Sequence, residues 1–256
     1  MRHISSRDNP QFKALRALVD DPRSHGRALV DGIHLVSTCL ACGIGIKQLL
    51  VSESGQNNAE ISALLQSTAE VDGMVLRDSL FRELSGVSTP TGIAAVIDIP
   101  ATPAGGPMGD AVLLDAVQDA GNVGAILRTA AAAGVGDVLL GPGCAGAWTS
   151  RVLRGGQGAH FSLAIRELAD LAAALSASAA TSVATVARGG ANLYELDLTE
   201  PVLWLVGNEG AGLSAELAAA AKLRVTIPLA AGTESLNVAA ATAVCLFEAR
   251  RQRSAR

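Results

Sequence analysis

The sequence is poor in aromatic residues and cysteine, and it has no long hydrophobic run. Seven of its 256 residues are Phe, Trp or Tyr, and its four cysteines lack the spacing of a disulfide framework. The longest uncharged stretch of the second half, residues 171–187, is too short and too rich in Ala, Ser and Thr to cross a bilayer. No continuous apolar segment near the N-terminus resembles a secretory signal. We therefore expect a cytoplasmic protein without a membrane helix.

Positive charge is also scarce, and the net charge of −4 argues mildly against nucleic-acid binding. The charge is unevenly distributed, however. Residues 1–30 carry a net +3, and residues 248–256 carry another +3. Two basic ends on an acidic body can meet phosphate groups locally. The alternative is that both ends are simply solvated, and charge alone favours that alternative.

A segment rich in Pro and Gly divides the chain. Residues 98–110, DIPATPAGGPMGD, contain three Pro and three Gly and no apolar period, which is typical of a linker. The sequence therefore predicts one domain over residues 1–97 and a second over residues 111–256. In the first, helical and strand-like segments alternate, as in a small α/β domain.

The second half alternates more clearly between strands and helices. Its near-continuous apolar runs are typical of strands in a parallel sheet that is buried on both faces. The predicted strands are residues 111–116, 137–140, 161–165, 182–186, 202–207 and 223–228, and the predicted helices are 123–133, 168–177, 213–222 and 236–251. This pattern predicts an α/β fold: an open parallel sheet with helices on both faces.

Two short patterns resemble ligand motifs without their required surroundings. Gly141, Gly143 and Gly146 form a G-x-G-x-x-G, but Pro142 stiffens the turn and the acidic partner of a dinucleotide site is missing. An ordinary Gly-rich turn is the favoured interpretation. Cys39-Leu-Ala-Cys42 is a C-x-x-C, but no second pair completes a zinc site. We expect buried core cysteines there and no metal.

Three further segments each place polar groups at a turn between a strand and a helix. In the first, DAVQDAGNVGAILRTA (115–130), Asn122 can cap the helix and Arg128 lies one turn beyond Gly124 on the same face. In the second, LVGNEGAGLS (205–214), a strand enters a Gly-rich turn that carries Glu209 and lacks the Lys-Ser/Thr of a P-loop. Taken alone, the first segment is better explained by an Arg128 that forms a surface salt bridge. The second segment alone is better explained by a Glu209 that is merely exposed at a turn.

The third segment is IPLAAGTESLNVAAA (227–241), where Pro228 stops a strand and a small-residue helix follows. Ser235 and Asn237 are expected in the first helical turn, where exposed backbone N–H groups favour a ligand. Simple capping by Ser235 is the alternative, and this segment alone favours it.

Together and in this order, the three segments closely resemble the signature motifs of the SpoU/TrmH family of RNA ribose 2′-O-methyltransferases. The run SLNVAAATAVCLFEARRQR is similar to the C-terminal helix of that family, and RGGQGAHF (154–161) to its intervening segment. Residues 28–32 and TPTGI (89–93) resemble, less specifically, the accessory N-terminal domain of rRNA-directed members. Ala120 and Gly155-Gly156 depart from the family pattern, where Pro and Ser are common.

The resemblance implies a C-terminal trefoil knot in the methyltransferase domain, an exception to the rule that protein chains are not knotted. It also implies S-adenosylmethionine as cofactor, held by Gly207, Ile227, Leu236 and Ser235, largely through backbone groups. Gly207 is expected to leave room for close approach of that cofactor. The N-terminal domain is expected to deliver RNA, so a fragment starting near Gly109 should still fold and bind cofactor. Members of that family are homodimers, so the resemblance also implies a homodimer here.

Arg128 is the residue on which the resemblance places the chemistry. A neutral 2′-hydroxyl is a poor nucleophile, and its proton must leave or its oxyanion must be stabilised. A guanidinium does not readily lose a proton, so we expect electrostatic stabilisation of the oxyanion by Arg128. Asn122, Glu209 and Asn237 are expected to orient Arg128, the ribose and the cofactor.

The extra N-terminal domain favours rRNA over tRNA as the substrate. A tRNA methyltransferase remains an alternative, as does a non-catalytic RNA-binding or ribosome-assembly protein of the same fold. A Rossmann oxidoreductase built on Gly141 is a third alternative. Cofactor binding separates the classes, since they would bind S-adenosylmethionine, nothing, or NAD.

Overall fold

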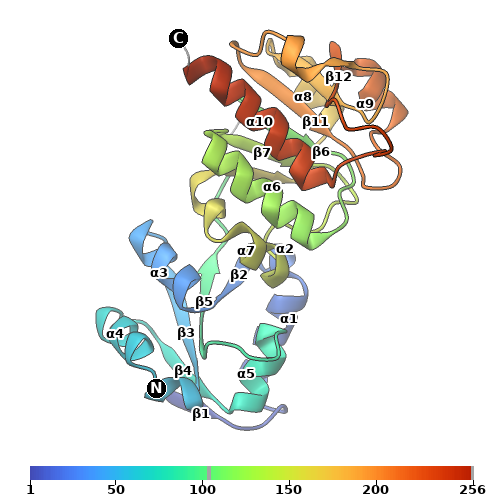
Figure 1. Ribbon diagram of the computed structural model, residues 1–256. Coiled ribbons are helices and arrows are strands. Elements are labelled where there is room, and N and C mark those ends of the chain that lie inside the picture. The colour runs from blue at the N-terminus through green and yellow to red at the C-terminus, as the bar shows by residue number, and fades with distance from the viewer. Residues whose placement is uncertain (103–104, 255–256) are drawn as a thin grey trace. The chain divides into compact units, whose positions relative to one another are not determined.

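The computed structural model describes residues 1–102 and 105–254, and the chain forms two compact units (Figure 1). The first unit comprises Met1–Ala101 and Trp148–Phe161, and the second comprises Thr102–Ala147 and Ser162–Arg256. The expected division assigned all of residues 111–256 to one domain. The structure differs over residues 148–161, because their helix packs on a strand of the first unit.

The first unit contains a five-stranded mixed sheet with helices packed against it. Its strand order is β1-β4-β3-β5-β2, in which β1, β4 and β3 run parallel and β5 is antiparallel to β3 and β2. The strands are β1 (Arg2–Ile4), β2 (Arg27–Asp31), β3 (Ile46–Ser52), β4 (Gly73–Leu76) and β5 (Ile93–Asp98). The helices are α1 (Pro10–Asp20), α2 (Pro22–His25), α3 (Ile33–Ala41), α4 (Ala59–Ser67), α5 (Asp78–Ser85) and α7 (Ser150–Gly156). Apolar residues of α1 and α5 pack with the sheet in one buried core cluster.

The second unit contains a seven-stranded parallel sheet with the order β10-β12-β9-β11-β6-β7-β8. Its strands are β6 (Ala111–Leu114), β7 (Asp137–Leu140), β8 (Ala164–Glu167), β9 (Thr181–Thr185), β10 (Ala191–Asn192), β11 (Val202–Val206) and β12 (Leu223–Thr226). Its helices are α6 (Ala120–Ala133), α8 (Leu171–Ala177), α9 (Ala215–Ala220) and α10 (Val238–Ser254). The prediction of an α/β fold with a parallel sheet is confirmed.

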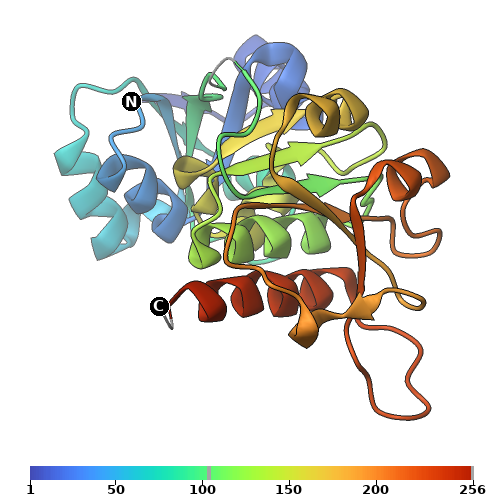
Figure 2. The same cartoon turned by 90° about the horizontal axis from the view of Figure 1, so that it is seen from above.

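Helices cover both faces of this second sheet (Figure 2). Leu171 of α8 and Leu217 of α9 join a core cluster with Leu113, Leu139 and Leu205 of the strands. Helices α6 and α10 lie side by side on the opposite face (Figure 2). The central strand β11 is buried along its whole length, as its apolar sequence predicts.

Several element boundaries differ from the sequence prediction, and the differences on either side of β8 have a clear local cause. Residues 161–165 were expected to form a strand, but Ala159–Ser162 form a 3₁₀ turn and β8 begins at Ala164. The following helix was expected from residue 168, but Leu168 has a positive φ of 51° and Asp170 caps a helix that begins at Leu171. Side-chain capping therefore decided where that helix begins.

The two ligand-like patterns lie in ordinary surroundings. After β7, residues 141–146 form a turn, and the next helix opens only at Ser150. Cys39 is buried as expected, but Cys42 is exposed at the C-terminal end of α3, so the expectation of a buried pair is wrong for Cys42. Among the described residues there is no cluster of His, Cys, Asp and Glu suited to a metal ion. No described helix is long and apolar enough to span a bilayer.

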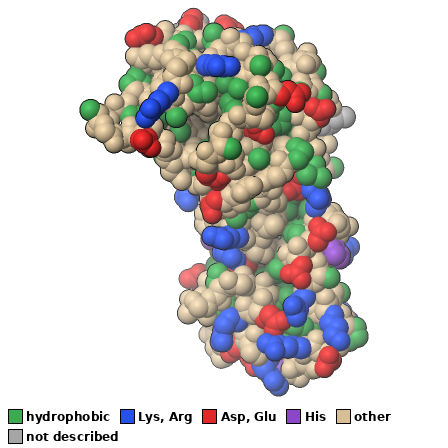
Figure 3. Space-filling model, turned by 90° about the vertical axis from the view of Figure 1, so that its right-hand side faces the viewer, with side chains coloured by type: hydrophobic (Ala, Val, Ile, Leu, Met, Phe, Trp, Pro, Cys, Tyr) green, Lys and Arg blue, Asp and Glu red, His purple; other side chains and the backbone are tan. Residues whose placement is uncertain are grey.

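Much of the charge on the basic ends is paired with nearby carboxylates. Arg2 pairs with Asp72, and both Arg7 and Arg16 pair with Glu83. Positive and negative side chains are accordingly interspersed on the first unit, in the lower part of Figure 3. At the other end, Arg251 pairs with Glu248, and Arg253 with Asp110. Neither end is therefore an uncompensated basic patch, at least over the described residues.

The Glu248 carboxylate on α10 is expected to make the thermal stability of the protein depend on acid pH. Hydrogen bonds from Arg251 and Gln252 lower its pKa from 4.5 to about 2. A carboxyl with a depressed folded-state pKa contributes stability that is complete above its unfolded pKa and is lost as the pH falls through the folded value. We expect wild-type melting temperature to fall more steeply than that of Glu248→Gln between pH 4.5 and about 2. Parallel slopes in a thermal-melting series would contradict this expectation.

Candidate functional site

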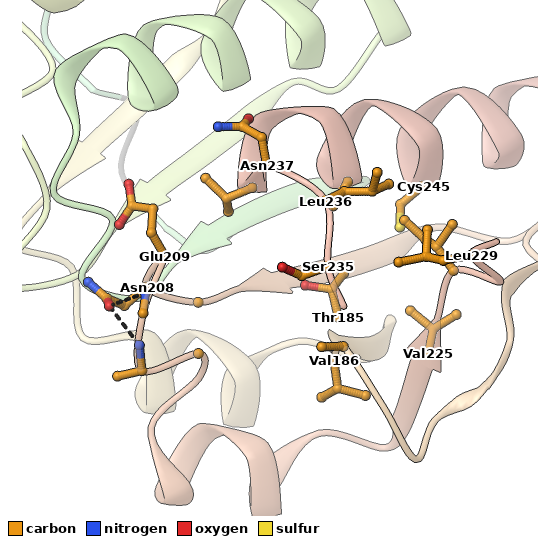
Figure 4. Close-up of a pocket in the computed structure, with 18 residues that line it drawn as sticks. Thr185, Val186, Asn208, Glu209, Val225, Leu229, Ser235, Leu236, Asn237 and Cys245 are labelled. Atoms are coloured by element: carbon orange, nitrogen blue, oxygen red, sulfur yellow. Dashed lines mark hydrogen bonds between the residues drawn. The ribbon is translucent and has the colours of Figure 1, made fainter. Parts of the chain in front are cut away.

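A cavity of about 590 Å³ lies in the second unit, where three neighbouring parallel strands end (Figure 4). Its walls are the segments that follow β9 (185–187), β11 (207–212) and β12 (227–229), together with residues 235–245 at the start of α10. Open α/β sheets bind ligands beyond the carboxyl ends of their strands. The volume is in the range of pockets that hold small organic molecules.

The cavity is lined mostly by apolar side chains and loop backbone. Val225, Leu229 and Cys245 lie towards one side of the cavity, and Ser235 lies near Thr185 (Figure 4). Ile227 also lines the wall, and Leu236 is 37% exposed at it. An apolar wall with a few polar groups suits a ligand that carries both a flat apolar ring and polar substituents.

At position 207 the surrounding backbone leaves room only for glycine. It is buried at the end of β11, and a Cβ atom there would lie 2.2 Å from the Leu213 nitrogen and 2.3 Å from the Gly212 carbonyl carbon. These backbone atoms approach because Asn208 and Gly212 exchange two hydrogen bonds, of 3.0 and 2.9 Å. We expected Gly207 to leave room for a ligand. That expectation stays a prediction, and the structure adds a second reason for glycine, since Gly207 also leaves room for the tight turn that forms the cavity wall.

Asn208 fastens this turn to the loop that follows β6. Its Oδ1 accepts hydrogen bonds from the N–H groups of Gly210 and Ala211, both at 2.9 Å, and its Nδ2 donates to the Ala116 carbonyl at 2.8 Å. Ala116 has a φ of 54°, a left-handed conformation that is unusual for alanine. Asn208 was not among the site residues predicted from the sequence. Its place in a Gly-rich turn after a strand was the available signal.

Glu209, Asn122 and Asn237 form a hydrogen-bonded chain at the cavity. Asn122 Nδ2 donates to Glu209 Oε1 at 3.0 Å, and Asn237 Nδ2 donates to Asn122 Oδ1 at 2.9 Å. The three residues come from segments up to 115 positions apart in sequence. Glu209 and Asn237 line the cavity, and Asn122 joins them from the first turn of α6. One residue from each of the three sequence motifs is thus brought into one network.

This network keeps Glu209 ionised. Partial burial opposes its ionisation, but hydrogen bonds from Asn122 and from the backbone N–H groups of Asp119 and Gln118 outweigh burial and lower the pKa of Glu209. The carboxylate is therefore a fixed acceptor at neutral pH. It sets the orientation of the Asn122 amide, whose oxygen then accepts from Asn237.

The caps of the two helices at the site differ from expectation. The side chain of Asp119 caps α6 by accepting from the Asn122 N–H at 2.8 Å, so Asn122 lies inside the helix and does not cap it. Asn237 accepts from the N–H groups of Ala239 and Ala240 and precedes α10, and Ser235 lies two residues earlier. Neither Ser235 nor Asn237 is therefore within the first turn, and the alternative in which Ser235 caps α10 is wrong.

Arg128 is exposed on α6 and does not line the cavity. It lies six residues beyond Asn122, roughly 9 Å along the helix axis. Within the described part of the chain, its guanidinium has neither an ion pair nor a hydrogen bond, so the salt bridge considered as an alternative is not formed there. A guanidinium without an internal partner is available to an external anion.

Comparisons with known proteins are consistent with this geometry. A family model described as "SpoU rRNA Methylase family" matches residues 110–247. The chain is 32% identical over 254 residues to the Bacillus subtilis 23S rRNA (guanosine(2553)-2′-O)-methyltransferase RlmP, covering 98% of this chain and 100% of the relative. It is 31% identical to the 23S rRNA (uridine(2479)-2′-O)-methyltransferase of Streptomyces viridochromogenes, covering 98% of this chain and 93% of the relative.

Solved structures of methyltransferases also superpose on nearly the whole chain. An AdoMet-bound rRNA methyltransferase from Sinorhizobium meliloti superposes with a TM-score of 0.84 at 28% identity, covering 98% of this chain and 97% of that one. The SpoU methyltransferase AviRb from Streptomyces viridochromogenes, in complex with AdoMet, superposes with a TM-score of 0.81 at 26% identity, covering 97% of this chain and 100% of that one. Both similarities extend over the two units of the chain.

Proposed function

The chain belongs to the SpoU rRNA methylase family, and from this premise we propose that it methylates a ribose 2′-hydroxyl of ribosomal RNA with S-adenosylmethionine. The observation that carries the proposal is the junction of the three motifs at one cavity. Glu209 and Asn237 line that cavity, and Asn122 links them through hydrogen bonds of 3.0 and 2.9 Å. This is the arrangement expected of a site that binds a small cofactor beside a polar reaction centre.

The residues at the cavity fit S-adenosylmethionine. Ile227 and Leu236 offer apolar surface to an adenine ring, and the backbone around Gly207 and the Ser235 hydroxyl offer polar partners to its substituents. When bound, this cofactor supplies a methyl group on a sulfonium centre. We propose Gly207, Ile227, Ser235 and Leu236 as its binding residues, with Gly207 acting through the shape of its turn.

We propose Arg128 as the catalytic residue. The attacking 2′-oxygen becomes more negative as it loses its proton, and a nearby guanidinium stabilises that charge. Arg128 keeps its own proton, because the pKa of a guanidinium lies far above neutral pH. The fixed carboxylate of Glu209 and the amides of Asn122 and Asn237 orient the reacting groups near α6, which lowers the entropic part of the barrier.

We further propose a trefoil knot and a homodimer. The knot is supported by the path after β12, since residues 227–237 line the same cavity as the loops after β9 and β11. The dimer is proposed from the family resemblance, and Phe247, 46% exposed on α10, is one apolar side chain that such an interface could cover. A cytoplasmic location follows from the proposed RNA substrate.

Ribosomal RNA is favoured over tRNA by the extent of the similarity. Relatives named as 23S rRNA methyltransferases align with 98% of this chain, including the first unit. A structure described as a TrmH/SpoU tRNA modifying enzyme covers 58% of this chain. The first unit, which contains the predicted domain of residues 1–97, is therefore proposed to bind RNA. A non-catalytic role is disfavoured because the Asn122–Glu209–Asn237 network is complete.

The proposed function is tested by mapping ribose methylation with mass spectrometry. We expect one 2′-O-methylated nucleotide of rRNA to disappear when the gene is deleted and to return with the wild-type protein but not with Glu209→Ala. Calorimetry should show S-adenosylmethionine binding to the wild type. An unchanged rRNA map together with a lost tRNA methyl group would replace the rRNA substrate by tRNA. NAD binding without S-adenosylmethionine binding would overturn the proposal.

A further inference from the structure

Residues 148–161, which we call the strap, belong to the first unit although they lie between two strands of the second sheet in sequence. The chain leaves β7 in the second unit, forms the strap in the first unit, and returns to β8 in the second. It therefore passes between the units at 101/102, 147/148 and 161/162. Two of these three crossings belong to the strap, so the linker at 98–110 is not the sole connection.

A partly buried ionic group anchors the strap within the first unit. Arg154 Nη1 donates to the Ser85 carbonyl at 2.9 Å and lies 3.5 Å from Asp31 Oδ2. The Ser85 hydroxyl donates to the same Asp31 oxygen. The Asp31 side chain is 5% exposed and the Arg154 side chain 29% exposed. Because a buried carboxylate is costly without a partner, Asp31 favours a cation at this place.

Asp31 has few other partners. Its Oδ1 has no hydrogen-bond partner among the residues described, and burial raises its pKa while Ser85 and Arg154 oppose the rise. Arg154 is thus the one cation that the structure pairs with Asp31 in the described chain. Removing Arg154 would leave a carboxyl that must either lose its charge or admit water.

The glycines of the strap also fit the first unit. Gly158 has a φ of 90°, and a Cβ atom there would lie 2.6 Å from Thr38 Cγ2 of α3. A Cβ atom on Gly156 would lie 2.5 Å from the His160 ring, which is itself 5.2 Å from the Trp148 ring. A serine is common in the family near Gly156, but here the buried His160 requires glycine. The strap is therefore shaped for its place beside α3, β2 and α5.

From these contacts we infer that Arg154 is a positioning residue, which fastens the strap to Asp31 and Ser85 and so keeps the strap in the form that the RNA-binding unit presents to RNA. The inference rests on the proposed function for its consequence, because a displaced strap weakens the hold of that unit on RNA. It also alters the expectation for a fragment starting near Gly109. Such a fragment keeps the strap but lacks Thr38, Ser85 and Asp31.

The anchoring is tested in the full chain by hydrogen–deuterium exchange, which needs no RNA. In Arg154→Met we expect amides of residues 150–156 to exchange about tenfold faster, since an unpaired buried carboxylate destabilises its surroundings. Amides of β6 and β11 in the second unit should not change. The double variant Arg154→Met/Asp31→Asn removes both charges and should recover part of the protection. Unchanged exchange of 150–156 in Arg154→Met would overturn the inference.

The consequence for the reaction is tested by methylation kinetics on rRNA. Arg154→Met should raise KM for RNA about tenfold, with S-adenosylmethionine affinity within about twofold of the wild type, because the cavity is untouched. Asp98→Asn is the matched control, since it weakens the exposed Arg27–Asp98 pair beside β2 without removing a cation and should leave KM unchanged. Equal KM values for wild type and Arg154→Met would overturn the positioning role. No methylation by the wild type would instead overturn the proposed function, while the exchange result would still decide the anchoring.

Discussion

Replacing Arg128 with alanine is expected to lower the single-turnover rate of RNA ribose methylation by about 10²–10³, the usual cost of one lost oxyanion-stabilising group. Cofactor affinity should change little, because Arg128 does not line the cavity. Stability should also change little, because the guanidinium is exposed and has no ion pair within the described chain. An interaction made only near the transition state affects the rate and not ground-state binding.

Arg128→Lys distinguishes the geometry of the guanidinium from its charge. Lysine keeps the charge but lacks the planar fork of donors, so we expect partial rescue of the rate. The measurement is single-turnover methylation with excess enzyme, alongside calorimetry with S-adenosylmethionine and thermal melting for each variant. Near-normal turnover in Arg128→Ala would exclude the proposed catalytic role. A large drop in melting temperature would indicate a structural role.

Replacing Gly207 with alanine is expected to reduce S-adenosylmethionine binding below detection. A single methyl group at this position would meet backbone atoms of Gly212 and Leu213 at 2.2–2.6 Å, and backbone cannot move aside as a flexible side chain can. The turn must open, which breaks the two hydrogen bonds between Asn208 and Gly212 and shifts Glu209. The cavity wall and the polar chain through Asn122 would be disturbed together.

Gly210→Ala is the matched control, in the same turn and with the same added methyl group. The nearest atom to a Cβ on Gly210 is Asn208 Oδ1 at 3.6 Å, an ordinary contact, so binding should remain close to that of the wild type. Gly143→Ala tests the other Gly-rich segment. An alanine at position 143 would be strained by the φ of 84° there, so this variant should be less stable but should still bind the cofactor. Equal binding by Gly207→Ala and Gly210→Ala would contradict this account of the turn.

The sequence by itself determined six of the seven strands of the second sheet, all but the two-residue β10, and the family. Fully apolar runs such as 202–206 are compatible with burial on both sheet faces, and a parallel sheet is what provides such burial. The three motifs follow strands β6, β11 and β12, and their order along the chain is a local property that sequence preserves. The short strands β1 and β4 and the helix α7 were not predicted, because their lengths of three, four and seven residues give too few turns of any period.

Tertiary structure alone decided which groups meet. Asn122 and Asn237 are 115 residues apart, and no local pattern could show that their amides bond to each other. The competition between Asn122 and Asp119 to cap α6 was settled by where the loop after β6 is held by Asn208 and Glu209. Nor could the sequence show that the strap belongs to the first unit. That assignment depends on the contacts of Arg154 with Asp31 and of Gly158 with Thr38. Such contacts depend on the packing of distant segments, which residue spacing along the chain does not encode.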